Sequence, residues 1–182
     1  PNRHEGKIVG LAAFGDPSRL HPGIRARFDL EHPDYFRFKS GQDALFERSV
    51  VGRFSREDVA AAYQRVLEDV ASHYVGKWLR RTGLRHVACA GGVFANVKMN
   101  QRIVELPEVE QLYVFPAMGD GGVGAGAGYA LHADLQGLEP ARLPDVYLGP
   151  AYTERELEAA LAELGTPFAR AGDVEAEIAR HL

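Results

Sequence analysis

The clearest hydrophobic pattern in the chain begins after Ser55. Apolar residues recur there at intervals of three and four positions, as on one face of an α-helix: Val59, Tyr63, Val66, Leu67, Val70, Tyr74 and Trp78. Ser55 is a favoured N-cap residue, acidic residues occupy the first turn after it, and Gly83 suits a helix C-terminus. The pattern therefore predicts one long amphipathic helix between Ser55 and Gly83.

Short apolar runs alternate with helical patterns after this helix. We expect strands at 86–90 and 111–116, and helices at 93–105 and 121–136. Strands and helices that alternate in this order are typical of a parallel or mixed α/β sheet. The last of these helices is rich in glycine and alanine, small residues that permit close packing on a sheet although glycine lowers helix propensity.

The segment before Ser55 has little periodicity. Aromatic and β-branched residues favour two short strands, around 35–38 and 46–50. Residues 5–15 combine a charged pair with a glycine-bounded apolar stretch, which we interpret as a loop leading into a buried strand. A second interpretation gives Lys7 a contact with a phosphate or a carboxylate.

A change in composition near residue 140 predicts a domain boundary. Prolines in 138–150 indicate a linker, with a short strand at 146–148. The capping-box sequence Thr153–Glu156 then predicts another helix. Because the chain starts without Met and a helical pattern runs up to its end, we expect it to be a piece of a longer protein.

Charge and composition narrow the possible classes. The chain has 21 Lys and Arg against 25 Asp and Glu, a net charge of -4, which argues against a nucleic-acid partner. Neither a membrane-spanning apolar run nor a signal-peptide pattern is found, so we expect a cytoplasmic protein with no membrane partner. The single Cys89 excludes a disulfide framework, and its place in a predicted buried strand disfavours a nucleophilic role.

Two glycine-rich turns follow the two predicted strands. They are Ala90–Asn96 and Gly119–Gly126. Each lies where a strand ends and a helix begins, and unpaired backbone amides at a helix N-terminus attract phosphate. Glycine also lets a phosphate or a sugar approach the main chain closely. Two such turns in succession indicate a nucleotide held between neighbouring helix N-termini.

Three polar side chains in these turns have two interpretations each. Asp120, flanked by glycines, could coordinate a divalent metal that bridges phosphates, or it could cap the following helix. Asn96 and Asn100 lie four residues apart on one helix face, where their amides could contact a base or a ribose, or only solvent.

Residues 119–124 also spell Gly-x-Gly-x-x-Gly, so an NAD-dependent oxidoreductase remains an alternative. The context is poor, because residues 116–118 separate the strand from the first glycine and no second strand ending in an acid follows. The 7 histidines show no helical metal-ligand spacing, so we expect no self-contained zinc site.

Together these segments resemble the O-carbamoyltransferases of the nodulation-factor, cephamycin and tobramycin pathways. The matching stretches are 5–15, 90–93 with Asn96 and Asn100, 116–122, and 148–153. The resemblance implies an α/β structure of the actin-like ATPase (ribonuclease-H-like) fold. Residues 1–140 would form the C-terminal half of its nucleotide-binding domain. Residues 141–182 would form a linker and the beginning of a YrdC-like domain, a second α/β domain.

The resemblance also implies a reaction. In that family, carbamoyl phosphate and ATP form carbamoyl-adenylate in the YrdC-like domain. The actin-like domain then transfers the carbamoyl group to a hydroxyl of a small-molecule or sugar acceptor and releases AMP. The implied partners are carbamoyl phosphate, the acceptor and the rest of the parent chain. A non-catalytic nucleotide-binding module of the same fold remains an alternative.

The resemblance assigns roles to particular residues. Asp120 corresponds to a catalytic aspartate that binds iron, or another divalent metal, beside the nucleotide phosphates. The implied nucleotide-binding set is Gly91, Gly92, Asn96, Asp120, Gly121 and Gly122. The family's other metal ligands are a His-x-x-x-His pair, which this sequence lacks. We therefore expect the activity to belong to the full-length protein and this chain alone to be inactive.

Overall fold

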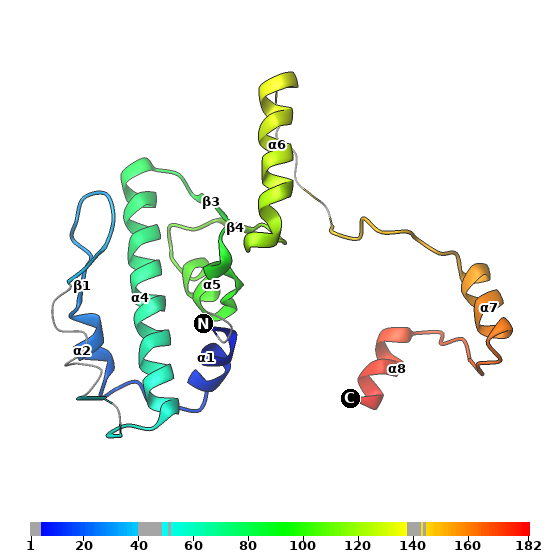
Figure 1. Cartoon of the computed structure of the whole chain (residues 1–182), viewed down its shortest axis with the longest axis horizontal. Helices are drawn as coiled ribbons and strands as arrows, with labels where there is room; N and C mark the ends of the chain where they lie inside the picture. The colour runs from blue at the N-terminus through cyan, green and yellow to red at the C-terminus, as the bar shows by residue number, and fades with distance from the viewer. Residues whose placement is uncertain (1–4, 40–48, 51, 138–142, 144) are drawn as a thin grey trace. The chain divides into compact units, whose positions relative to one another are not determined.

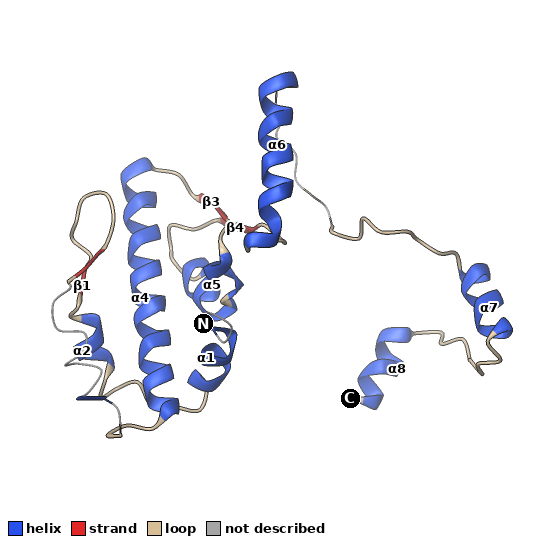
Figure 2. Ribbon diagram, viewed as in Figure 1, coloured by secondary structure: helices blue, strands red, loops and turns tan. Residues whose placement is uncertain are grey.

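A computed structural model describes residues 5–39, 49–50, 52–137, 143 and 145–182. The chain divides into two compact units, Pro1–Glu139 and Pro140–Leu182. The elements of the first unit are, in chain order, α1 (Glu5–Ala12), α2 (His21–Arg25), β1 (Phe28–Asp29), β2 (Arg37–Phe38), α4 (Arg56–Thr82), β3 (His86–Cys89), the 3₁₀ turn η1 (Gly92–Ala95), α5 (Val97–Val104), β4 (Gln111–Val114), the 3₁₀ turn η2 (Asp120–Gly122) and α6 (Val123–Gln136) (Figure 1). The second unit carries α7 (Glu154–Glu163) and α8 (Val174–His181). Helices predominate and the strands are short, so the mixed α/β class is confirmed (Figure 2).

Helix α4 organises the first unit, and its bounds confirm the predicted helix. The Ser55 side chain accepts a hydrogen bond from the backbone N–H of Asp58 at 3.0 Å, as an N-cap does. The helix ends at Gly83, whose φ of 72° is a conformation that glycine adopts without steric cost. In Figure 1, α2 and β1 lie along one side of α4, and α1 and α5 along the other.

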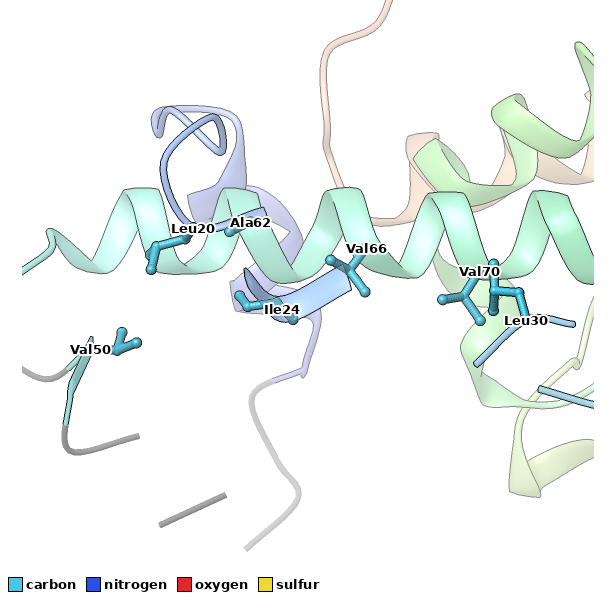
Figure 3. Close-up of a cluster of buried hydrophobic side chains, with 7 residues drawn as sticks. All are labelled: Leu20, Ile24, Leu30, Val50, Ala62, Val66 and Val70. Carbon is cyan, nitrogen blue, oxygen red and sulfur yellow. The ribbon is translucent and has the colours of Figure 1, made fainter. Parts of the chain in front are cut away.

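The hydrophobic core lies between α4 and the segment that precedes it. Three residues spaced four apart on α4, which are Ala62, Val66 and Val70, pack against buried side chains from that segment (Figure 3). These side chains are Leu20, Ile24, Leu30 and Val50. The predicted apolar face is confirmed at Val66 and Val70, whereas Tyr63 stays 44% exposed. Burying this face supplies much of the stability that holds α4 in place.

Strands β3 and β4 pair in parallel, as predicted, in a register from His86 opposite Gln111 to Cys89 opposite Val114. Parallel strands need a crossover connection, and η1 with α5 supplies it. The backbone pairing continues past the strands, because the N–H of Phe115 donates to the carbonyl oxygen of Cys89 at 3.0 Å. The pairing therefore leads directly into the first glycine-rich turn, and through residues 116–118 into the second.

Expectations from the weaker patterns differ from the structure. Residues 5–15 form α1 and a turn, so the loop-and-strand interpretation is wrong. Of the strand expected at 46–50, residues 46–48 lie outside the described residues, and Ser49 and Val50 are helical. The strand expected at 146–148 is also wrong. An apolar run becomes a strand only where another strand can pair with it, and pattern alone does not reveal that.

The helices at 93–105 and 121–136 are confirmed with later starts. In both, a 3₁₀ turn occupies the first residues, and the α-helix begins at Val97 and Val123. The strand around 35–38 is confirmed at Arg37–Phe38, which pairs antiparallel with Phe28–Asp29. In the part of the chain that the structure describes, no helix combines the length and apolar character needed to cross a bilayer.

We predict that Ser55→Ala lowers the free energy of unfolding by about 1 kcal/mol, because the Asp58 N–H loses its acceptor at the start of α4. Urea denaturation measures the change. Ser72→Ala is the control, since Ser72 lies inside the same helix, where alanine is the better helix former. An equal loss in both variants would contradict the capping role.

Candidate functional site

The two glycine-rich turns meet at the carboxyl ends of β3 and β4. The N–H of Gly91 in the first turn donates to the carbonyl oxygen of Met118, just before the second, at 2.7 Å. A cavity of about 470 Å³ lies between them, and its lining includes Gly91, Met118, Gly119, Asp120, Gly122 and Tyr129. The structure therefore brings Gly91, Asp120 and Gly122 together. Crevices at the carboxyl ends of parallel strands are common ligand sites in α/β proteins.

The first turn is tight and depends on glycine at one position. Gly91 has φ 113° and ψ 144°, a conformation that side-chain-bearing residues rarely adopt. Its carbonyl oxygen accepts the N–H of Phe94 at 3.0 Å, which closes η1. Gly92 lies at the start of η1 and lines a second, apolar cavity of about 640 Å³ beside α1 and α4.

The second turn is tight for a steric reason. The N–H of Gly122 donates to the carbonyl oxygen of Gly119 at 2.9 Å. A Cβ atom at Gly122 would lie 2.0 Å from the carbonyl oxygen of Ala117, so only glycine fits without movement of the backbone. Gly121 has open space around it and is exposed. The turn thus presents its backbone at the edge of the smaller cavity.

Asp120 is exposed at the start of η2. The N-cap positions of η2 and α6 belong to Gly119 and Gly122, and neither helix start has a side-chain cap. The capping interpretation of Asp120 is therefore wrong. Among the described residues, no group of three His, Cys, Asp or Glu side chains is placed to hold a metal ion, so Asp120 does not form a metal centre with them.

Asn96 is buried, with 8% of its surface exposed, so the solvent-facing interpretation is wrong. Its Oδ1 accepts the N–H of Met99 at 3.0 Å, which makes Asn96 the N-cap of α5. Its Nδ2 donates to Gln64 Oε1 at 2.8 Å. Asn96 lines the larger cavity, apart from Asp120, and a contact between its amide and a nucleotide stays a prediction.

Asn100 also holds the first turn. Its Nδ2 donates to the carbonyl oxygen of Phe94 at 2.7 Å, which ties the first full turn of α5 back to η1. The Oδ1 atom of Asn100 is buried, and it has no hydrogen-bond partner among the described residues. The side chain thus supports the turn while leaving one buried acceptor unfilled.

Cys89 lies at the end of β3 and lines the smaller cavity, but its environment disfavours nucleophilic chemistry. Burial raises the pKa of the thiol above its ordinary value, because desolvation penalises the thiolate. At neutral pH the thiol stays protonated. This agrees with the expectation from the sequence that Cys89 lies on a buried strand and that a nucleophilic role is disfavoured.

Sequence reasoning missed two buried polar residues of α4, Gln64 and Glu68, which are 9% and 5% exposed. They lie on the helix face opposite Val66, because two residues along a helix correspond to about 200° of rotation. The small residues Ala60 and Ala61 on that side were a usable signal, since they permit the close approach of another helix. That helix is α5.

The family model described as carbamoyltransferase N-terminus matches residues 1–129. An uncharacterised protein of Methanocaldococcus jannaschii is 35% identical over 170 residues, 87% of this chain and 27% of that protein. The nodulation protein NolO of Bradyrhizobium diazoefficiens is 31% identical over 85% of this chain and 31% of its own length. A tRNA N6-adenosine threonylcarbamoyltransferase of Bordetella avium is 33% identical over 62% of this chain and 37% of its own length. The chain thus spans less than two thirds of these relatives.

We predict opposite effects for two glycine substitutions near the second turn. Gly122→Ala places a Cβ atom against the carbonyl oxygen of Ala117 and should lower the free energy of unfolding by about 1–3 kcal/mol. Gly124→Ala in α6 meets no atom within 4 Å and should raise it by about 0.5–1 kcal/mol. Urea denaturation of both variants measures the signs. A neutral Gly122→Ala would show that the turn is not sterically constrained.

Proposed function

Because this chain belongs to the carbamoyltransferase family, in the region described as that family's N-terminus, we propose that it contributes the nucleotide-binding part of an ATP-dependent carbamoyltransferase. The observation that carries the proposal is the junction of the two glycine-rich turns. The bond from Gly91 to Met118 brings them to one cavity, with Asp120 at its edge.

Backbone groups at this junction suit a phosphate. The first N–H groups of a helix have no acceptor within the helix, and η2 with α6 begins beside the cavity. Gly121 and Gly122 carry no side chain that would keep an anion from these groups. In our proposal they bind the phosphates of the nucleotide, while Gly91 and Gly92 lie against its adenosine part.

The same proposal assigns a fold and two domains to the chain. Residues 1–140 would be the C-terminal half of an actin-like ATPase domain, and the parallel pair β3–β4 with its α5 crossover would be part of that domain's sheet. Residues 141–182 would be a linker and the start of a YrdC-like domain. The rest of the full-length protein would supply the remaining parts of the site.

The proposed reaction uses carbamoyl phosphate, ATP and a hydroxyl acceptor. The oxygen of a small-molecule or sugar hydroxyl attacks the carbamoyl carbon of carbamoyl-adenylate. The bond between that carbon and the phosphate oxygen breaks, AMP leaves, and the hydroxyl proton passes to a base or to solvent. The N–H of Gly121 holds the phosphate on which negative charge develops, which stabilises the leaving group, and Gly122, whose own N–H is bonded to Gly119, lets the phosphate approach the main chain.

Asp120 is the side chain at this site that we propose takes part in the transfer. An iron or other divalent ion would polarise the carbamoyl carbonyl and neutralise phosphate charge. One carboxylate is too few ligands for such an ion, and among the described residues no group of three His, Cys, Asp or Glu side chains is placed to hold one. In our proposal Asp120 contributes one ligand, and the rest of the full-length protein would supply the others.

A non-catalytic nucleotide-binding module is the second candidate, because the junction of the turns would serve binding equally well. It differs in forming no carbamoyl-adenylate. No observation favours the NAD alternative: in the described part of the chain the parallel sheet contains only β3 and β4, without the acidic strand that a dinucleotide fold requires.

We predict that Asp120→Asn in the full-length protein lowers the rate of carbamoyl transfer by about 100-fold or more, since even indirect partners of a metal ligand contribute 10–100-fold. Asp134→Asn is the matched control, because Asp134 is exposed near the far end of α6. AMP release in the presence of ATP, carbamoyl phosphate and a panel of hydroxyl acceptors measures the rate.

Three outcomes separate the candidates. Loss of transfer in Asp120→Asn alone supports the proposal. Unchanged transfer would show that Asp120 has no catalytic role. ATP binding by the wild-type protein without any carbamoyl-phosphate-dependent AMP release would favour the binding module.

A further inference from the structure

Gln64 of α4 and Asn96 at the start of α5 form a reciprocal pair of carboxamides. Asn96 Nδ2 donates to Gln64 Oε1 at 2.8 Å, and Gln64 Nε2 donates back to Asn96 Oδ1 at 3.1 Å. Because Asn96 Oδ1 also accepts the N–H of Met99, the orientation of its amide is fixed. Both side chains are buried, so each bond replaces solvent that the groups have lost.

A further partner holds Gln64 in this orientation. Its Nε2 also donates to Glu68 Oε1, one helical turn along α4, at 3.0 Å. Glu68 is buried and faces Arg102 of α5, with 3.6 Å between Glu68 Oε2 and Arg102 Nε. The carboxylate is thus paired on both sides, and Gln64 connects it to Asn96. The polar contacts between α4 and α5 form one continuous chain.

The first glycine-rich turn is fastened at both ends. At one end the N–H of Gly91 bonds to Met118, and at the other the side chain of Asn96 bonds to Gln64. Between these two bonds lies η1, Gly92–Ala95, in which no residue is buried and Gly92 has open space around it. The position of the turn therefore depends on Met118 and on Gln64, two residues outside it.

An apolar side chain at position 64 could fill the same space between α4 and α5, but it would leave the buried Nδ2 atom of Asn96 without its acceptor. It would not fix the direction of the Asn96 amide. The hydrogen-bonded pair therefore specifies one orientation of the turn, which apolar packing alone would not do.

We propose that Gln64 is a positioning residue for the first glycine-rich turn, which acts through Asn96 to hold Gly91–Ala95 in the geometry that receives the nucleotide. The inference rests on the proposed function only in naming the nucleotide. The claim that Gln64 orders the turn rests on the hydrogen bonds alone.

Gln64→Met in the full-length protein tests the proposal, because methionine keeps the length of the side chain and removes its hydrogen bonds. Hydrogen exchange of the amides of Phe94, Asn96 and Met99, which all donate within or beside the turn, reports its order. We expect exchange at these amides to quicken by about tenfold, and the dissociation constant for ATP to rise by about tenfold, because the turn loses the hydrogen bonds that fix its position.

Glu68→Gln is the matched control on the next turn of α4. It keeps an acceptor for Gln64 and leaves the Gln64–Asn96 pair intact, so exchange in the turn and ATP affinity should stay within about twofold of wild type. Should Gln64→Met fail to fold, Gln64→Ala replaces it, because alanine also removes the hydrogen bonds, cannot overpack its neighbours and has the highest helix propensity, and the same changes in exchange and ATP affinity are expected.

The outcomes separate this inference from the proposed function. Faster exchange in the turn and weaker ATP binding in Gln64→Met, with Glu68→Gln unaffected, support the positioning role. Unchanged exchange in Gln64→Met, or equal effects of both variants, would overturn it. If the wild-type protein bound no ATP, the proposed function would fail, and the exchange rates would still decide the role of Gln64.

Discussion

One backbone hydrogen bond, from the N–H of Gly91 to the carbonyl oxygen of Met118, brings together the two segments that form the candidate site. It lies beyond the parallel pairing of β3 and β4, which ends at the bond from the Phe115 N–H to the Cys89 carbonyl oxygen, so it joins the two turns themselves. The cavity lies between the turns that this bond joins, with Asp120 exposed at its edge, and the close fit of Gly122 against Ala117 holds the second turn itself tight.

Helix α4 is the support on which this junction rests. One of its faces packs into the apolar core, through Val66 and Val70, and the opposite face carries Gln64 and Glu68 against α5. The first face stabilises the helix through apolar burial, and the second fixes the orientation of the Asn96 side chain through hydrogen bonds. A helix capped at both ends and buried on two sides is a rigid base for a turn built largely of small residues.

Strong local signals predicted much of this structure. The spacing of apolar residues and the flanking Ser55 and Gly83 placed α4 correctly, and the alternation of strands and helices indicated the parallel pair. The N-terminal segment could not be predicted, because α1 acquires its structure by packing on a helix far along the chain. Gln64 was overlooked for a related reason. A glutamine is expected to be exposed unless a partner for its amide is known, and the partner of Gln64 is Asn96, the N-cap residue of a different helix.

The central claim is that both glycine-rich turns bind one nucleotide, and hydrogen exchange of the full-length protein with and without ATP tests it most directly. The account predicts that peptides covering 88–96 and 116–124 gain protection together and saturate at the same ATP concentration, because one ligand orders both turns. Protection of one turn alone, or protection confined to other parts of the protein, would contradict a nucleotide site at the junction of Gly91 and Met118.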